Sequence, residues 1–309
     1  MIIIGAGISG LLCGALNHGS IIYEKNSPCD KGHQALFRCR SNQIGKVLGI
    51  EFKEVTVSKA IWHNGREVSP TPRLANLYSQ KVAGKILDRS ISDISTDKRF
   101  LPPQNFVEIL KSRCNTIHYN TEFDIEVHRS SKCSGTPIVS TIPMPAMLSI
   151  LGIKHKICFS ANSIYVSRLH IANCDANCTI YYPDPTIGPY RASLTQNLLI
   201  IESIMPIGEN DLCMVCDSIG VSKTSCESTT ECVMNYEQKF GKITPIDSIQ
   251  RKNSIVSMTI HNNVYSLGRF ATWRPKVVFD DILDDIDNIN RLIRGGSYAA
   301  LQHKQEERN

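Results

Sequence analysis

The sequence lacks any apolar run that approaches the roughly 20 residues needed to cross a bilayer. It also has no low-complexity or collagen-like segment, and its 42% of hydrophobic residues is too high for a disordered chain. We therefore expect a folded protein that makes no membrane contact. A chain of 309 residues buries roughly three quarters of its unfolded surface, which is enough for one large domain or two interleaved ones.

Twelve cysteines are present, but signals for disulfides and metals are weak. Met1 leads directly into an apolar triplet and glycines, without the basic segment that opens a secretory signal. We therefore expect a cytoplasmic protein with reduced thiols. Cys213 and Cys216 have the spacing of metal ligands, but residues 212–217 are predicted as a strand and no second cysteine or histidine pair follows. No metal is predicted.

The net charge of +5 is unevenly distributed along the chain. Residues 280–309 contribute −3, so the remainder of the chain carries +8. Solvated surface lysines explain such an excess, and charge alone favours that explanation. A modestly basic body is also compatible with an anionic ligand such as a nucleotide cofactor.

The most informative segment lies at the start of the chain. An apolar triplet at residues 2–4 is followed by a glycine-rich turn, a short helical pattern and a second apolar strand that ends at Glu24. Gly5 permits a tight turn, Gly7 lets a pyrophosphate approach the backbone, and Gly10 lets the helix pack closely on the strand. The free amides of the helix attract phosphate, and Glu24 is suited to accept hydrogen bonds from ribose hydroxyls. This arrangement predicts a dinucleotide-binding unit.

Hydrophobic periodicity predicts a β-rich middle of the chain, with helices on either side. We expect strands over residues 47–68, 115–123, 126–128, 138–142, 157–204, 210–217, 254–261 and 263–267. We expect helices over residues 72–94, 106–113, 146–151, 229–240 and 279–292.

Several segments beside the glycine turn resemble the flavoprotein superfamily that includes amine oxidases and UDP-galactopyranose mutases. They are the acidic residue and loop from Glu24 to His33, the strand end at residues 140–143, the segment 181–191 ending in Tyr190-Arg191, and the segment 268–273 beginning Gly268-Arg269-Phe270. The sequence departs from this family in its first helix, which is about one turn shorter, and at Lys31, where the family has a glycine.

The resemblance implies an α/β fold in which a Rossmann-like FAD-binding domain is interleaved with a β-rich α+β substrate domain. The FAD-binding domain is expected at residues 1–45, 105–150 and 255–300, the substrate domain at 46–104 and 151–254, and a flexible tail at 301–309. The residues expected to bind FAD are Gly5, Ala6, Gly7, Ser9, Gly10, Glu24, Lys25, Arg38, Thr141, Gly268, Arg269, Val278 and Phe279. Arg269 would contact the phosphates or ribityl chain, and the amides near Val278 would face the flavin.

Three residues are candidates for catalysis: His33 beside the flavin, and Tyr190 with Arg191 as a clamp for an anionic substrate. Structural roles are equally open for His33, and a simple turn is somewhat favoured for Tyr190 and Arg191. Arg38 and Arg40 could bind phosphate or lie on a solvated face.

The leading hypothesis is an FAD enzyme that oxidises a C–N bond in a small-molecule or nucleotide-linked amine. The chain also resembles small phage-encoded lyases of thymine hypermodification, which would make DNA a partner and the host cytoplasm its location. A mutase acting on a sugar-nucleotide and a non-catalytic nucleotide-binding protein remain alternatives. The sequence has no second glycine-rich motif for NAD and no Cys-x-x-Cys near the first helix.

Overall fold

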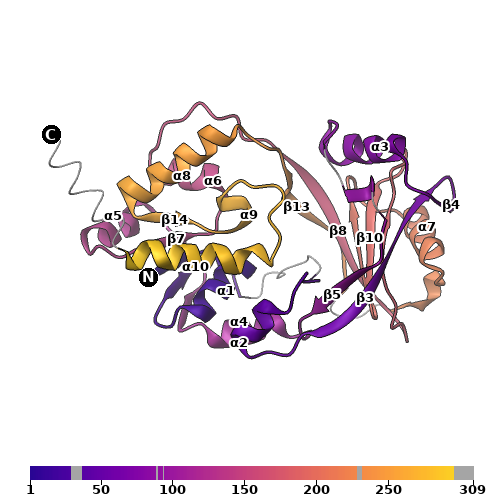
Figure 1. Ribbon diagram of the computed structural model, residues 1–309, viewed down its shortest axis with the longest axis horizontal. Coiled ribbons are helices and arrows are strands. Elements are labelled where there is room, and N and C mark those ends of the chain that lie inside the picture. Colours follow the sequence, from indigo (N-terminus) through magenta and orange to yellow (C-terminus); the bar gives the residue numbers. More distant parts are fainter. Residues whose placement is uncertain (29–36, 88–89, 93, 228–231, 296–309) are drawn as a thin grey trace.

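The computed structural model describes residues 1–28, 37–87, 90–92, 94–227 and 232–295, which form two lobes (Figure 1). One lobe is built on a parallel sheet surrounded by helices, and the other on a larger mixed sheet. Two strands of 11 residues, β8 and β13, extend from the first lobe into the second (Figure 1).

The parallel sheet consists of five three-residue strands drawn from distant parts of the chain. In spatial order they are β14 (Val264–Ser266), β7 (Ile138–Ser140), β1 (Ile2–Ile4), β2 (Ile21–Tyr23) and β6 (Thr116–His118). All four strand pairs are parallel. The apolar triplet at β1 is therefore hydrogen-bonded on both sides, as expected for a buried parallel strand.

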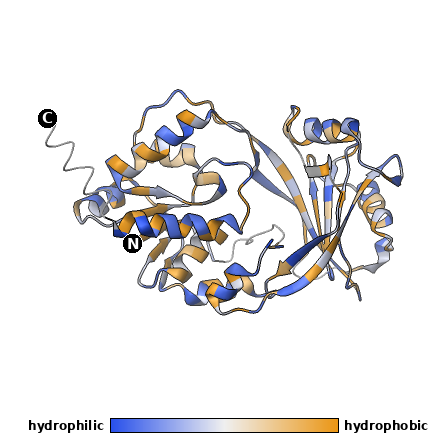
Figure 2. Cartoon of the chain, in the orientation of Figure 1, coloured by the Kyte–Doolittle hydropathy of each residue, from blue (hydrophilic) through white to orange (hydrophobic). Residues whose placement is uncertain are grey.

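Helices cover both faces of this sheet because successive side chains of a strand point to opposite faces. Ile3 packs in one apolar cluster and Ile4 in the other. The helices of the Ile3 face are α1 (Ile8–Leu16), α2 (Gln43–Leu48), α4 (Phe106–Arg113) and α10 (Asp281–Arg294). Those of the Ile4 face are α5 (Ile125–Cys133), α6 (Met144–Ile150), α8 (Ser248–Asn262) and α9 (Gly268–Ala271). In Figure 2, α10 alternates apolar and polar residues, as expected for a helix with one buried face.

The second lobe is a mixed sheet covered by one helix on each face. Its path is β12 (Cys226–Glu227), β8 (Ala161–Ile171), β11 (Leu198–Ser203), β10 (Pro189–Thr195), β9 (Asn177–Tyr181), β3 (Lys53–His63) and β4 (Arg66–Val68), while β13 (Val233–Ile243) pairs with β8 and β5 (Asp97–Leu101) with β3. Helix α3 (Pro72–Ala83) packs on one face and α7 (Glu209–Ile219) on the other. The shorter 3₁₀ turns are Ser90–Ser92 and Lys223–Ser225.

The predicted fold class is confirmed, as a Rossmann-like parallel-sheet unit is interleaved with a β-rich lobe. Four local predictions named the wrong type of element. The segments 126–128, 212–217 and 254–261 are helical, and residues 233–240 form a strand instead of a helix. For α8, the side chain of Asp247 accepts hydrogen bonds from the amides of Ile249 and Gln250, so an N-cap outweighs the β-branched residues that follow. Two other predicted elements were too long, because the helix expected over residues 72–94 ends at Ala83 and the strand expected over 115–123 covers only Thr116–His118.

Segment 212–217 was misassigned because a short apolar run does not distinguish the periodicity of a helix from that of a strand. In α7 the buried residues Val215 and Cys216 face the sheet, and the helix ends at Gly220, whose φ of 72° is left-handed. No helix in the described part of the chain combines the length and the apolarity that a membrane span needs.

Candidate functional site

The glycine turn between β1 and α1 is held by close backbone contacts. Gly5 has a φ of +93°, and a Cβ atom there would lie 2.6 Å from the hydroxyl of Thr141. That hydroxyl donates hydrogen bonds to the carbonyls of Ile4 and Gly5 at 2.7 and 3.3 Å. A Cβ atom on Gly10 would overlap the carbonyl oxygen of Gly5. Both positions therefore require glycine, and Thr141 fixes the turn from β7.

Gly7 differs from its two neighbours in the motif because it faces open space. Nothing lies within 4 Å of a Cβ atom built there, and its φ of −67° is ordinary. Gly7 is the N-cap of α1 and supplies no side-chain cap. In the described part of the chain, the amides of Ile8, Ser9 and Gly10 have no acceptor, so α1 begins with donors available to an anion.

Glu24 lies at the carboxyl end of β2, beside the turn. Its two carboxylate oxygens each accept one backbone hydrogen bond, from Ala6 at 2.7 Å and Asn26 at 2.9 Å. A carboxylate offers about four acceptor sites, so each oxygen can still accept from a ribose hydroxyl. The glycine turn, the free amides and this carboxylate fit the ADP portion of a dinucleotide.

The segment that begins α9 returns to this turn from late in the chain. Gly268 has a φ of +87°, and a Cβ atom there would lie 2.8 Å from the hydroxyl oxygen of Ser9. Arg269 donates a hydrogen bond to the carbonyl of Gly241 on β13 at 3.2 Å. Its guanidinium carbon lies over the ring of Phe270, 5.5 Å from the ring centroid. Two predicted cofactor residues, Ser9 and Gly268, are thus in close contact although they are far apart in sequence.

The N-terminus of α10 is tied to the segment that follows residue 36. One carboxylate oxygen of Asp280 accepts from the amides of Arg40 at 2.8 Å and Ser41 at 3.1 Å. The amide of Val278 donates to Asp281 at 2.9 Å, whereas those of Phe279 and Asp280 have no acceptor among the described residues. This helix end is therefore a second place where amides are available to a ligand.

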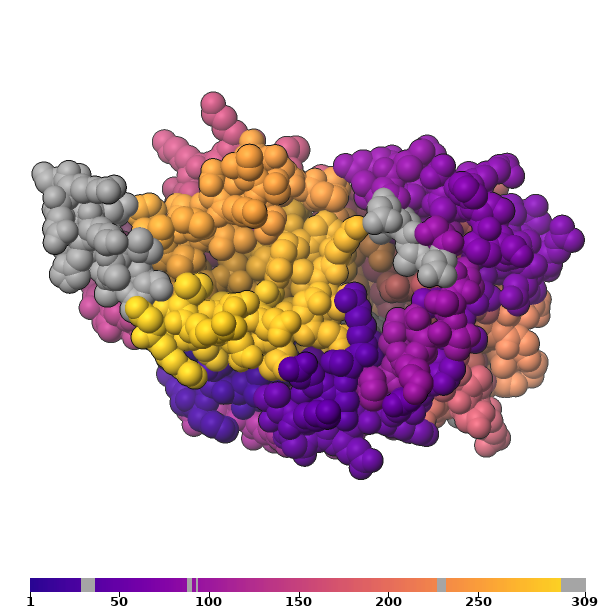
Figure 3. Space-filling model, in the orientation of Figure 1, coloured from indigo at the N-terminus to yellow at the C-terminus, as the bar shows by residue number. Residues whose placement is uncertain are grey.

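A cavity of about 300 Å³ separates the N-terminus of α10 from the mixed sheet. Val278, Phe279 and Asp280 line one side, and charged side chains of the sheet line the other. The molecular surface is recessed between α10, in yellow, and the second lobe (Figure 3). The cavity thus lies where the two lobes meet.

One charged cluster on this cavity centres on Glu202 of β11. Arg191 pairs with its carboxylate, the hydroxyl of Tyr190 donates to it at 2.9 Å, and Lys242 lies 3.9 Å away. Tyr190 and Arg191 are consecutive, yet both reach Glu202 because β10 has a bulge between Pro189 and Arg191. Burial raises the pKa of Glu202, but the two cations outweigh it and lower this pKa to about 2.

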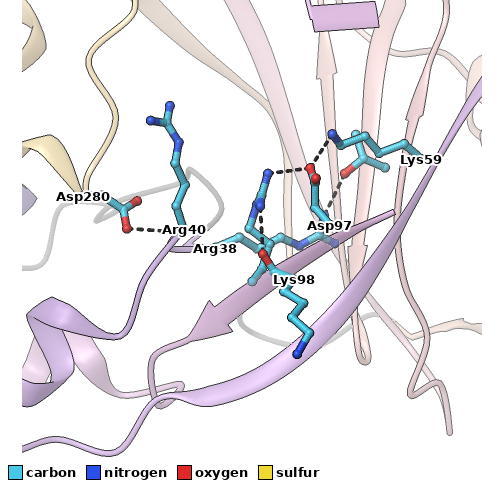
Figure 4. A network of polar contacts seen from close by, with 8 residues as sticks. Arg38, Arg40, Lys59, Asp97, Lys98 and Asp280 are labelled. Carbon is cyan, nitrogen blue, oxygen red and sulfur yellow. Dashed lines mark hydrogen bonds and ion pairs between the residues drawn. The ribbon is translucent and has the colours of Figure 1, made fainter. Parts of the chain in front are cut away.

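A second charged cluster centres on Asp97 of β5. Lys59 of β3 forms an ion pair with Asp97 (Figure 4). The Arg99 guanidinium lies 2.6 Å from the same carboxylate oxygen. The hydrogen bond from Lys59 lowers the pKa of Asp97 below its ordinary value, with Arg99 adding to the effect. Asp97 and Arg99 share one face of the strand, whereas Lys98, between them, is three-quarters exposed at 75%.

Arg38 contacts the mixed sheet and not the glycine turn. Its guanidinium donates to the hydroxyls of Thr195 at 2.9 Å and Thr179 at 2.7 Å, and to the carbonyls of Cys178 and Leu194. Burial lowers the pKa of Arg38 to about 10. It lies on the cavity wall, at a distance from the predicted dinucleotide turn, whose glycines do not line the cavity.

Most of the predicted site residues fall into two groups in space, while Arg269 contacts Gly241 of β13. Those at the glycine turn are Gly5, Ala6, Gly7, Ser9, Gly10, Glu24, Thr141 and Gly268, while those on the cavity are Arg38, Arg191, Val278 and Phe279. Tyr190 is completely buried, and Lys25 is exposed beyond β2. His33 lies outside the described residues, as does Lys31.

Sequence reasoning missed Lys59, Asp97, Arg99 and Glu202. One signal was available for Glu202, which is the only charged residue of β11 and follows four apolar residues. The charged alternation of Asp97 and Arg99 was a second signal. Among the described residues, no group of three His, Cys, Asp or Glu side chains is placed to hold a metal ion.

Comparison with known proteins identifies the fold of this chain but assigns it to no family. No protein-family model and no curated protein matches the sequence. A protein named as a protoporphyrinogen oxidase from Exiguobacterium sp. 255-15 matches with a TM-score of 0.54 and 8% identity, covering 94% of this chain and 98% of that one. The tetrameric form of 2-methyl-3-hydroxypyridine-5-carboxylic acid oxygenase matches with a TM-score of 0.51 and 12% identity, covering 98% of this chain and 91% of that one.

A third solved structure is PqsL of Pseudomonas aeruginosa, named as "a probable FAD-dependent monooxygenase". It matches at a TM-score of 0.49 and 10% identity, covering 98% of this chain and 90% of that chain. At such identities the first two matches show that the chain has the fold of these redox enzymes over almost its whole length.

Proposed function

We propose that the protein is an FAD-dependent oxidoreductase that oxidises the C–N bond of an amine or amino-acid-like substrate. One observation carries the proposal: the same cavity is lined on one side by Phe279 and Asp280, whose amides have no acceptor among the described residues, and on the other by fixed charges of the mixed sheet. The first boundary suits a flavin and the second suits a charged substrate, so the two reactants would be held against each other.

FAD would be bound along the elements that converge at the glycine turn. The amides of α1 and the open space at Gly7 would receive the pyrophosphate, and Glu24 would accept from the adenosine ribose. The amides of Phe279 and Asp280 would lie at the flavin end. When bound, FAD supplies the acceptor for a hydride from the carbon next to nitrogen.

The chain's own charged residues would orient the substrate and would not exchange protons with it. Glu202, with a pKa lowered to about 2, remains a carboxylate at neutral pH and holds Arg191 in place. Burial and Glu202 raise the pKa of Tyr190 well above its ordinary value, so its phenol stays protonated and donates to Glu202. These groups therefore form a fixed electrostatic frame around the substrate.

A narrower form of the proposal places the amino acid on a thymine base of DNA, so that the reaction releases the amine as a lyase would. The support for it is the sequence resemblance to phage-encoded enzymes and the basic body of the chain. This form predicts that DNA carrying amino-acid-modified thymine reacts, while the free amino acid alone does not.

The test is the visible absorption spectrum of the purified protein, recorded before and after anaerobic addition of amines, amino acids or modified DNA. We expect a flavin band that bleaches on addition of substrate without any other reductant. A protein without a flavin band, even after incubation with FAD, would overturn the proposal. Reduction only by a nicotinamide nucleotide would assign it to the monooxygenases, and conversion of a sugar-nucleotide only by pre-reduced protein would assign it to the mutases.

A further inference from the structure

The wall that the mixed sheet contributes to the cavity carries more positive than negative charge. Its cations are Lys59, Arg99 and Arg191, and its acids are Asp97 and Glu202. Arg38, from the segment that follows residue 36, also lines the cavity and is hydrogen-bonded to this sheet. A third acid on the cavity, Asp280, belongs to α10 and already accepts two backbone hydrogen bonds. Within the described ranges, three cations of the sheet and Arg38 therefore face only two carboxylates of the sheet.

The two carboxylates are each shared between cations. Asp97 pairs with both Lys59 and Arg99, and Glu202 pairs with Arg191 while Lys242 lies nearby. The six side chains involved are at most 36% exposed, so water screens their charges only in part. The positive excess is thus confined to a partly enclosed space.

Arg38 is the clearest sign of this excess. Its hydrogen-bond partners are two hydroxyls and two carbonyls, and no carboxylate of the described residues accompanies it. The charges of Arg191 and Arg99 add to the burial that lowers its pKa. A buried charge is costly unless an opposite charge accompanies it, so an anion in the cavity would stabilise all three guanidinium groups.

Two of these guanidinium groups retain donors for such an anion. Arg191 uses Nε and Nη2 on one oxygen of Glu202, which leaves its Nη1 without an acceptor in the described part of the chain. Arg99 uses Nη1 on the carbonyl of Lys98 and Nη2 on Asp97, which leaves its Nε. Oxyanions are the ligands that match guanidinium donors in geometry and charge.

We propose that this cavity binds an oxyanion, a carboxylate or a phosphate group, between Arg38, Arg99 and Arg191. The anion site itself does not depend on the proposed function. Only the assignment of the oxyanion to the substrate rests on that function. The pyrophosphate of a dinucleotide is not its occupant, because the glycine turn and the first turn of α1 contribute nothing to the cavity wall. The substrate would therefore present its anionic group to the sheet and its reacting carbon to α10.

The test measures binding of inorganic phosphate and of malonate by calorimetry at constant ionic strength, with and without FAD. We expect Arg99→Gln to weaken binding about tenfold or more, since a hydrogen bond to a charged group is lost. Arg38→Gln should weaken it at least as much. Lys98→Gln is the matched control because it removes a positive charge from the adjacent residue, whose side chain points away from the cavity wall (Figure 4).

Binding by Lys98→Gln at wild-type strength, with Arg99→Gln impaired, supports the site. Equal affinities for wild type and Arg99→Gln, or equal losses in both variants, would overturn it, as would wild-type protein that binds neither anion. Arg99→Gln decides the question if Arg38→Gln fails to fold. The anion that binds with the higher affinity, phosphate or malonate, identifies the preferred group as a phosphate or a carboxylate. Oxyanion binding by a protein that shows no flavin band would refute the proposed function and leave the site standing.

Discussion

Gly7 and Gly10 belong to the same turn but have different neighbours, so alanine at each position should have a different effect. At Gly10 a Cβ atom overlaps the carbonyl of Gly5, and Gly10→Ala should lower the free energy of unfolding by about 3 kcal/mol. At Gly7 the space is open and φ is ordinary, so Gly7→Ala should fold with nearly unchanged stability.

The same Gly7→Ala variant should bind FAD about tenfold or more weakly, because its methyl group occupies the approach of the pyrophosphate. Chemical denaturation of the cofactor-free variants and titration with FAD separate the two effects. Unchanged FAD affinity in Gly7→Ala would show that the cofactor does not approach this turn.

Glu202 gives a prediction about the pH dependence of stability. Its pKa is lowered to about 2 in the folded chain from an ordinary 4.5, so its stabilising contribution is complete above about pH 4.5 and is lost as the pH falls towards 2. Glu202→Gln leaves the charge of Arg191 without its carboxylate and should cost about 3 kcal/mol at pH 7. Urea denaturation should show the gap between wild type and variant closing below pH 4.5.

The matched control is Glu209→Gln, which removes an exposed carboxylate paired with Lys223. Its stability should stay within about 1 kcal/mol of wild type at every pH, because exposed ion pairs contribute little. A gap for Glu202→Gln that is constant with pH would mean that the carboxylate is not held ionised by its neighbours.

At the scale of elements, the side chain of Asp280 links the N-terminus of α10 to two backbone amides of the segment after residue 36. Asp280→Ala removes the acceptor for the amides of Arg40 and Ser41 and should lower the free energy of unfolding by about 1 to 3 kcal/mol. Hydrogen exchange at these two amides should accelerate at the same time. Asp287→Ala, on an exposed position of the same helix, should leave both quantities unchanged. Equal exchange rates in both variants would contradict the link.

At the scale of the whole molecule, the prediction from sequence succeeded where the constraint is local. The segment from β1 to Glu24 follows from glycine conformation and from a fully apolar strand, and both can be identified within 25 residues. The pairing of Asp97 with Lys59 could not be derived, because it exists only once β5 lies beside β3. The bulge that brings Tyr190 and Arg191 to one carboxylate is likewise a property of strand register. The proposed domain boundaries and site roles stay predictions.

The parallel sheet also has a consequence for synthesis of the chain. Its first strand pairs with β7 only after residue 138, and β14 joins at residue 264. At about 5 to 20 residues per second, roughly 15 to 50 seconds separate the emergence of the first strand from that of the last. From the emergence of residue 140 until that of residue 264, β7 offers an unpaired edge in a growing polypeptide. The protein should therefore depend on chaperones during translation more than a chain of equal length whose neighbouring strands are consecutive.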